Sequence, residues 1–260
     1  MGMDAVKSLF PIGDLHIHTQ DEVIAFSDYL NRRPEMLLIL LGDIIHFANS
    51  FWSPNSAHMD KKDMKTALKN DYKLWEDFFP RLKKPTILYY GTHEMFVLET
   101  CPKLGWPLPK HPEKINKRIV VPSDCEEIKL PNNSYVAGVH VLANICPSDE
   151  PKFCERKEVV EQQLEKTLHN FSPKSPERTV FCTHDPTDFY YTNLGYRALT
   201  QLLKKFPFKI HYHAHIHSNL REHTVGVTHT INRSFQALRR FKSEALEPLP
   251  ASLKTTDDTS

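Results

Sequence analysis

The stretch that decides the fold is Met36-Leu37-Leu38-Ile39-Leu40-Leu41-Gly42-Asp43. Its uninterrupted apolar run, with Pro34 just before it, predicts a β-strand that is buried on both faces. A strand covered on both sides needs other layers of structure above and below it. The stretch therefore predicts a layered α/β protein, with Gly42 and Asp43 at the carboxyl end of an inner strand.

Strands and amphipathic segments alternate on either side of this stretch. A strand is predicted to end near Ile12, and a capping box of Thr19 and Glu22 begins the helix after it. Apolar residues of that helix recur at spacings of three and four, so one face of it should be buried. The other predicted elements are helices at 60–82, 155–169 and 196–206 and strands at 86–90, 119–121, 127–130, 135–142, 179–183 and 208–212.

Loops and ends are predicted from composition. Residues 101–117 are rich in Pro and Lys and should form a loop, and 225–231 with about 234–238 should form a hairpin. No repeat or linker interrupts the chain, so 1–245 is predicted to be a single domain. Pro, Ser, Thr and Asp dominate 246–260, which predicts a disordered tail.

Composition excludes several classes of protein. The chain has 260 residues, 40% of them hydrophobic and 25% charged, with a net charge of +1, as in ordinary globular proteins. Near-neutral charge disfavours a duplex nucleic-acid partner. No apolar run is long enough for a membrane span, and the five cysteines form no CxxC pair, so we expect reduced thiols and a cytoplasmic location.

Polar clusters follow five of the predicted strands. In open α/β sheets, ligand sites gather at the carboxyl ends of strands, so these clusters should converge. Their side chains are carboxylates and imidazoles, which suit divalent Mn, Fe, Zn or Co. The clusters are Gly13-Asp14-Leu15-His16, Gly42-Asp43, Gly91-Thr92-His93-Glu94, Thr183-His184-Asp185-Pro186 and Ala214-His215-Ile216-His217.

The order of the clusters resembles the calcineurin-like metallophosphoesterase superfamily. That family carries DxH, then GD, then GNH followed by an acidic residue, then a lone His, then GHxH. The resemblance spans about residues 9 to 240. It implies an α/β/β/α sandwich of two mixed β-sheets flanked by helices, and a centre that binds two divalent metal ions.

The resemblance also implies a role for each matching residue. Asp14, His16 and His217 would bind the first metal, and His184 and His215 the second. Asp43 would bridge the two ions. A metal-bound hydroxide would attack phosphorus in line, while His93 contacts the substrate and assists the leaving group, so that Asp43 and His93 are the catalytic pair.

Three positions depart from the family pattern. Thr92 stands where the family has an Asn that ligates the second metal, and its shorter hydroxyl should bind that metal more weakly. Ala214 replaces a Gly, which matters only if the position needs a positive φ. His46, where many relatives carry an acidic residue, is predicted to contact substrate together with Thr92 and His93.

Simpler interpretations exist for these residues. His215 and His217 could belong to a solvated loop, and Asp14 or Asp43 could be a helix cap or turn residue. Either carboxylate alone would fit that interpretation, but both together fit it poorly. His18 and His213 are expected to be hydrogen-bonded or ligand-orienting histidines rather than substrate contacts.

The function predicted from these patterns is metal-dependent hydrolysis of a phosphoester. A small phosphodiester or nucleotide is favoured over a phosphomonoester, because the chain is small and shows no accessory domain. The alternative is a protein–protein interaction scaffold with weak or no activity. Thr92 supports the scaffold, whereas retention of His93 argues for the enzyme. The pattern leaves the metal and the oligomeric state open, with manganese the first ion to test.

Overall fold

The computed structural model describes residues 8–47, 61–140, 152–188, 195–217 and 222–236. Two sheets form its centre. The first sheet is parallel in all its pairings and has the order β1-β2-β3-β4. Its strands are β1 (Leu9–Ile12), β2 (Leu37–Leu40), β3 (Thr86–Leu88) and β4 (Ile119–Val120).

The second sheet is mixed and has the order β5-β6-β7-β8-β10-β9. Its four inner strands are parallel, and the strand at each edge is antiparallel to its neighbour. The strands are β5 (Ile128–Lys129), β6 (Tyr135–Val139), β7 (Thr179–Thr183), β8 (Ile210–His213), β9 (Glu222–Val225) and β10 (Thr228–Asn232).

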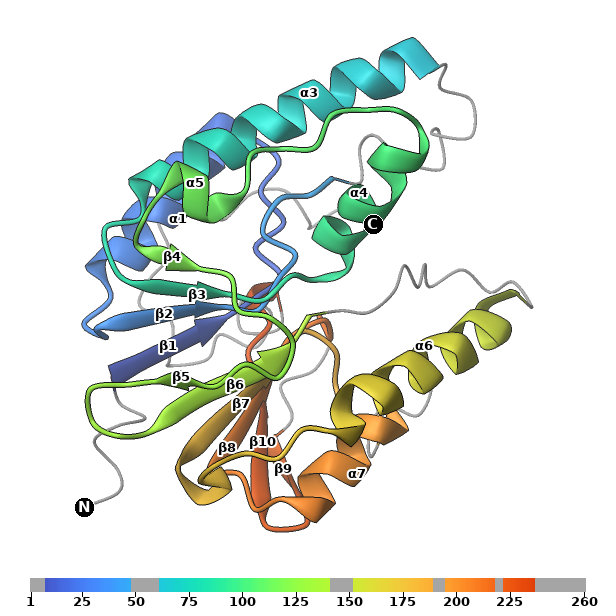
Figure 1. Cartoon of the computed structure of the whole chain (residues 1–260). Helices are drawn as coiled ribbons and strands as arrows, with labels where there is room; N and C mark the ends of the chain where they lie inside the picture. The colour runs from blue at the N-terminus through green and yellow to red at the C-terminus, as the bar shows by residue number, and fades with distance from the viewer. Residues whose placement is uncertain (1–7, 48–60, 141–151, 189–194, 218–221, 237–260) are drawn as a thin grey trace.

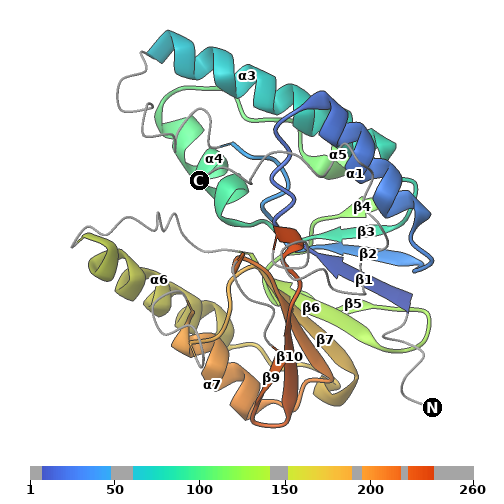
Figure 2. The ribbon, with the colours of Figure 1, turned by 180° about the vertical axis from the view of Figure 1, so that it is seen from behind.

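Helices cover the outer face of each sheet. Figures 1 and 2 show α1, α3 and α5 over the first sheet and α6 and α7 over the second. This is the predicted α/β/β/α sandwich, so the fold class is confirmed. The helices are α1 (Gln20–Arg32), α3 (Lys61–Phe78), α4 (Thr92–Lys103), α5 (Pro112–Ile115), α6 (Lys152–His169) and α7 (Arg197–Lys205), with 3-10 turns η3 (Phe79–Arg81) and η4 (Pro176–Arg178).

The apolar run of β2 is buried on both faces, as predicted. Leu38 and Leu40 pack under the helices of the first sheet, whereas Ile39 and Leu41 pack against the second sheet. Alternate side chains of a strand face opposite sides, so an inner strand between a helix layer and a sheet must be apolar throughout. The run therefore places β2 at the centre of the sandwich.

The helix after β1 begins as predicted. Thr19 accepts a hydrogen bond from the backbone of Glu22, and the Glu22 carboxylate accepts from the backbone of Thr19, which completes the capping box. The predicted apolar stripe of α1 is buried. The loop that carries Asp14 and His16 runs from the end of β1 to the start of this helix.

The loop predicted at 101–117 is wrong in part. Helix α4 continues to Lys103 with Pro102 in its last turn, and α5 forms at 112–115. Proline ends a helix soon after it occurs, but it also favours the first position of one, as Pro112 does. The loop prediction therefore holds for 104–111 and 116–117 and is wrong where α4 and α5 form.

The closing hairpin is shifted from its predicted position. The strands are β9 and β10, joined at Gly226, whose φ of +62° suits the tight turn. The run at 225–231, predicted as one strand, is interrupted by this turn. Ser234 instead forms an isolated bridge with Gly13 that ties the end of β10 to the end of β1.

Two predictions fall outside the described residues. One is the tail at 246–260, and the other is the end of the domain at 245. Within the part of the chain that the structure describes, none of the helices has the length and apolar character that crossing a membrane requires.

Candidate metal centre

The polar clusters converge at the carboxyl ends of strands from both sheets. Backbone hydrogen bonds continue past β1 and β2, from Asp14 N to Gly42 O (3.0 Å) and from His16 N to Asp43 O (3.0 Å). In the second sheet, Ala214 N donates to His184 O (3.0 Å). These bonds hold the loops side by side, so their side chains meet where the two sheets join.

Six side chains form two sets of three, which we call the first trio and the second trio. Within each trio, one candidate ligand atom per residue lies within 4.8 Å of the other two, as metal coordination requires. The first trio is Asp14, His16 and His217, and the second trio is Asp43, His184 and His215.

The first trio combines a fully buried carboxylate with a more open imidazole. Nε2 of His16 lies 3.2 Å from Nε2 of His217, which in turn lies 3.6 Å from Oδ1 of Asp14. Asp14 is inaccessible to solvent, whereas the His217 side chain is 39% exposed. This half of the centre is therefore the one that solvent reaches.

The second trio lies deeper. Nε2 of His184 lies 3.3 Å from Oδ2 of Asp43 and 3.1 Å from Nδ1 of His215. On the other side of its ring, Nδ1 of His184 donates a 2.7 Å hydrogen bond to the carbonyl of Leu41. That bond leaves the Nε2 lone pair directed at its trio. Nδ1 of His184 also lies 3.9 Å from Oδ1 of Asp14, so the two trios are adjacent.

Backbone strain is concentrated in these residues. Asp14, His16, Asp43 and His215 all have positive φ values, between 45° and 65°. This region is uncommon for residues other than Gly, and such strain persists only where the surrounding structure enforces it. Ala214 does not have a positive φ, so replacement of the family's Gly there carries no backbone cost.

Two glycines provide the space in which the second trio is packed. A Cβ at Gly91 would lie 2.5 Å from the backbone N of Asp43 and 2.9 Å from Cε1 of His184. A Cβ at Gly42 would overlap the backbone of Gly91, and Gly42 has a φ of +82°. The loops after β2 and β3 can touch only because both positions lack a side chain.

Opposite charges hold the trios together. Burial alone would raise the pKa of the Asp14 and Asp43 carboxyls, but neighbouring imidazoles keep both well below their ordinary value. Burial alone would lower the pKa of His184 and His217, but the carboxylates of Asp43 and Asp14 raise it. Each trio thus pairs an ionised carboxylate with one imidazole of raised pKa.

The donor set fits divalent metal ions. Both carboxylate oxygens of Asp14 are buried, and among the described residues neither has a hydrogen-bond donor closer than Nε2 of His217, which lies 3.6 Å from Oδ1. A buried, ionised and unsatisfied carboxylate is costly unless a cation neutralises it. Oxygen and imidazole nitrogen donors suit Mn, Fe, Zn and Co ions, as predicted from the sequence.

Glu94 links two loops of the centre through hydrogen bonds to their backbone. Its carboxylate accepts hydrogen bonds from the backbone N atoms of Asp43 and Ile44 (both 2.8 Å) and of Gly91 (3.0 Å). Burial raises the pKa of this carboxyl to about 7, and the charge of Asp43 adds to that effect. Glu94 therefore ties the loop after β2 to the loop after β3 and does not itself face the trios' ligand atoms.

Thr92 and His93 begin helix α4, immediately after Gly91. The backbone N of His93 donates a 2.8 Å hydrogen bond to Oδ1 of Asp43, and its Nε2 lies 3.9 Å from Oδ2 of the same residue. Thr92 is buried. The structure thus places His93 next to the second trio, whereas the contact of Thr92 with a metal stays a prediction.

His46 and His18 lie beside the first trio. Nδ1 of His46 lies 3.2 Å from Nδ1 of His16, and its ring centroid lies 4.1 Å from that of His18 and 5.1 Å from that of His93. His213 lies inside β8, is fully buried, and has its Nδ1 3.1 Å from the carbonyl oxygen of Ala214.

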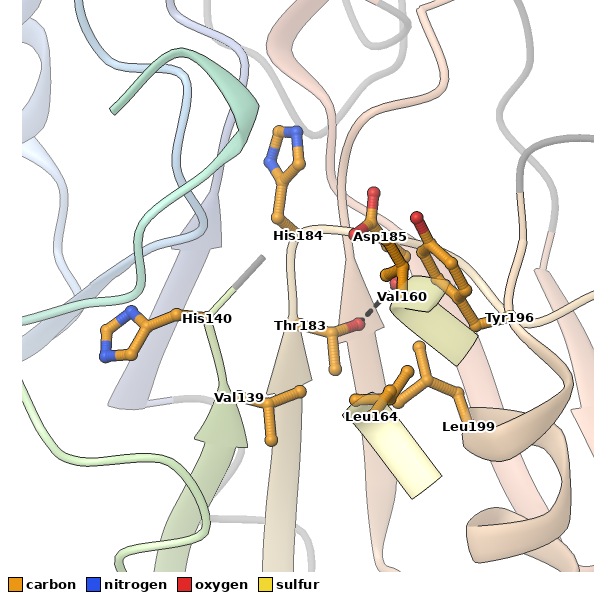
Figure 3. Close-up of a pocket in the computed structure, with 9 residues that line it drawn as sticks. All are labelled: Val139, His140, Val160, Leu164, Thr183, His184, Asp185, Tyr196 and Leu199. Carbon is orange, nitrogen blue, oxygen red and sulfur yellow. Dashed lines mark hydrogen bonds between the residues drawn. The ribbon is translucent and has the colours of Figure 1, made fainter. Parts of the chain in front are cut away.

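A small pocket lies behind His184, between β6, β7, α6 and α7. Figure 3 shows Asp185 and Tyr196 side by side at one end of it, with the His184 imidazole pointing away. Its volume of 10 Å³ is about what one water molecule needs, so it is too small for a substrate. Asp185 is buried. Burial lowers the pKa of His215, and the charge of Asp185 opposes that shift only in part.

Sequence reasoning missed one partner of the centre, the carbonyl of Leu41 that orients His184. Leu41 belongs to the apolar run of β2 and has an unremarkable side chain, and its role is carried by the backbone. No pattern of side chains could have indicated it.

Comparisons with known proteins identify the family of this chain. A family model described as calcineurin-like phosphoesterase matches residues 11–219, so the chain belongs to that family and the predicted membership is confirmed. The family is generally one of metal-dependent phosphoester hydrolases. A search of curated proteins found no match.

Solved structures show the same fold at low sequence identity. The phosphopantetheinyl hydrolase PptH from Mycobacterium tuberculosis is 13% identical, with a TM-score of 0.51 over 95% of this chain and 94% of that one. Another crystal structure is 14% identical, with a TM-score of 0.53 over 86% and 89%. A protein of Thermus thermophilus, TT1561, is 14% identical, with a TM-score of 0.49 over 88% and 89%. At these identities the likeness concerns the fold alone.

Proposed function

We propose that this protein is a metal-dependent phosphoesterase that hydrolyses a small phosphodiester or a nucleotide. The observation that carries the proposal is the pair of adjacent trios, in which four of the six side chains stand on strained backbone. Backbone strain of this kind costs free energy and persists only where the surrounding structure enforces it. Such strained residues are found most often at functional sites.

Each trio is proposed to hold one divalent ion. Asp14, with His16 and His217, would bind the first ion, and His184 with His215 the second. Asp43 would bridge the two, and Thr92 would contribute a weak oxygen ligand to the second. Two bound ions supply a water-derived nucleophile at neutral pH and polarise the phosphoryl oxygens.

His93 is proposed to contact the substrate and assist the leaving group. Its backbone bond to Asp43 anchors it at the centre, and its side chain is 14% exposed. Burial lowers the pKa of this imidazole, so it is neutral at pH 7. A neutral imidazole can donate a hydrogen bond to the leaving oxygen through its one N–H.

Two neutral imidazoles lie beside the centre. Burial lowers the pKa of His46 to about 3, with His18 adding to the effect, so both His46 and His93 are neutral at pH 7. A neutral imidazole can donate a hydrogen bond to a phosphoryl oxygen. The preference for a diester over a monoester follows from the small size of the chain and stays a prediction. Substrate contact by Thr92, a cytoplasmic location and manganese as the metal remain predictions.

The test is hydrolysis of paired aryl phosphate mono- and diesters with Mn²⁺, with metal counted on the same sample. We expect turnover that favours the diester, and two metals per chain. His93→Ala should lower kcat about 100-fold or more with unchanged metal content. His169→Ala, on an exposed position of α6, is the matched control and should behave like the parent.

Two outcomes would count against parts of this proposal. If the protein shows no turnover and holds one metal or none, the alternative of an interaction scaffold is favoured. Thr92 is the feature that supports that alternative. A His93→Ala variant that hydrolyses as fast as the parent would show that His93 has no role in the chemistry.

A further inference from the structure

The two ring nitrogens of His16 face different partners. Its Nε2 lies in the first trio, 3.2 Å from Nε2 of His217. Its Nδ1 points the opposite way and lies 3.2 Å from Nδ1 of His46. His16 is 8% exposed, so few other partners can reach either nitrogen.

The chemistry of an imidazole decides the direction of this hydrogen bond. A neutral imidazole has one N–H and one lone pair. If Nε2 of His16 binds a metal through its lone pair, Nδ1 must carry the hydrogen and donate it. Nδ1 of His46 must then accept, which leaves the hydrogen of His46 on its own Nε2.

Backbone contacts hold His46 in place for this bond. The backbone N of His46 donates to Ile17 O (3.1 Å), and Ile17 N donates to Ile44 O (2.9 Å). The chain after β1 and the chain after β2 therefore run side by side as far as His46. The ring of His18 packs on the outer side of His46, with centroids 4.1 Å apart.

We propose that His46 is a positioning residue that accepts the Nδ1 hydrogen of His16 and so directs the Nε2 lone pair of His16 at the first metal. This role rests on the proposed function, because it presumes that the first trio binds a metal. It plays the part that the carbonyl of Leu41 plays for His184 in the second trio. Nε2 of His46 is the nitrogen that remains for a substrate.

Two substitutions separate acceptance of the hydrogen from simple packing. His46→Asn can place an oxygen acceptor near the position of Nδ1, whereas His46→Leu fills space without an acceptor. His169→Leu, on an exposed position, is the control. Zn²⁺ affinity is measured by calorimetry on metal-stripped protein, and the tautomer of His16 by nitrogen-15 NMR of its ring. Neither readout requires turnover, so the result is independent of whether a phosphoester is cleaved.

His46→Leu should weaken the first Zn²⁺ about 10- to 100-fold and leave the second unchanged. His46→Asn should stay within a few-fold of the parent, and in both the parent and this variant His16 should carry its hydrogen on Nδ1. Equal first-metal affinity in the parent and His46→Leu would overturn the proposal.

A third bound metal would overturn it in another way. His16, His46 and His93 each offer a nitrogen within 4.8 Å of the others and could hold an ion themselves. If the parent binds three Zn²⁺ and His46→Leu binds two, His46 is a ligand and not an acceptor.

Discussion

The two trios of the metal centre contain the same kinds of side chain but are supported differently. In the second trio, His184 is oriented by a backbone carbonyl, and Asp43 is fixed by Glu94 through its backbone N. Gly91 packs directly against both Asp43 and His184. In the first trio, Nδ1 of His16 contacts a side chain, that of His46, and His217 is partly exposed to solvent.

This difference separates the kinds of change that each half can tolerate. A backbone carbonyl cannot be removed by substitution, so the second trio is sensitive to added volume and backbone shifts. A side-chain partner can be replaced, so the first trio is sensitive to substitution of that partner. Metal affinity at the two sites should therefore respond to different mutations.

Gly91→Ala should have the largest effect and should act on the second trio. The added Cβ would lie within 3 Å of the Asp43 backbone and of His184, so the ligands must move. We expect the second metal to bind about 10- to 100-fold more weakly, and the first, which would share Asp43, to weaken by a smaller factor. Calorimetric titration with Zn²⁺ checks both.

The control for this substitution is Gly105→Ala. Among the described residues, nothing lies within 4 Å of a Cβ at Gly105, although its φ is +67°. This variant should lose about 1–2 kcal/mol of stability through backbone strain and keep both metal affinities. Equal second-metal affinity in Gly91→Ala and the parent would show that the loop after β3 can retract at little cost.

The two trios should resemble each other in their response to pH. Without metal, the pKa of His217 in the first trio and of His184 in the second lie above the ordinary value, so both rings hold an extra proton near pH 6.5. A metal must displace that proton. Affinity should therefore rise with pH, by about tenfold per pH unit for each proton released, until the pH exceeds these pKa values.

Calorimetry in two buffers of different ionisation enthalpy measures this release. At pH 6.5 the apparent binding enthalpy should differ between the two buffers. The difference should correspond to the release of about one proton for each metal bound. The effect should fade in both trios as the pH rises above the pKa values of these two imidazoles. An enthalpy that is the same in both buffers would mean that the metal-free imidazoles are already neutral.

Thr92→Asn should have the smallest effect. An amide oxygen reaches further than a hydroxyl and is a better neutral ligand, so the second metal should bind about fivefold more tightly, equal to about 1 kcal/mol. Thr92→Ser keeps the hydroxyl and serves as the control. Identical titrations of Thr92→Asn and the parent would indicate that Thr92, or a water it holds, already supplies the ligand.

The elements that could be predicted are those whose pattern is local. The strand at 179–183 and the capping box of α1 were predicted correctly, because a short buried run and a helix cap both depend on near neighbours in sequence. The loop at 101–117 and the closing hairpin were predicted incorrectly. Proline is compatible with both ends of a helix, and the turn at Gly226 breaks an otherwise strand-like run, so local composition does not distinguish the outcomes.

Sequence by itself determined the types of candidate ligand, their order and their position after strands, because Asp and His at the ends of parallel strands must meet at one edge of a sheet. It could not determine which nitrogen of each imidazole faces a metal. That choice depends on what lies behind the ring, which is Leu41 O for His184 and His46 for His16. Leu41 and His184 lie far apart in the chain, and only the stacking of the two sheets brings them into contact.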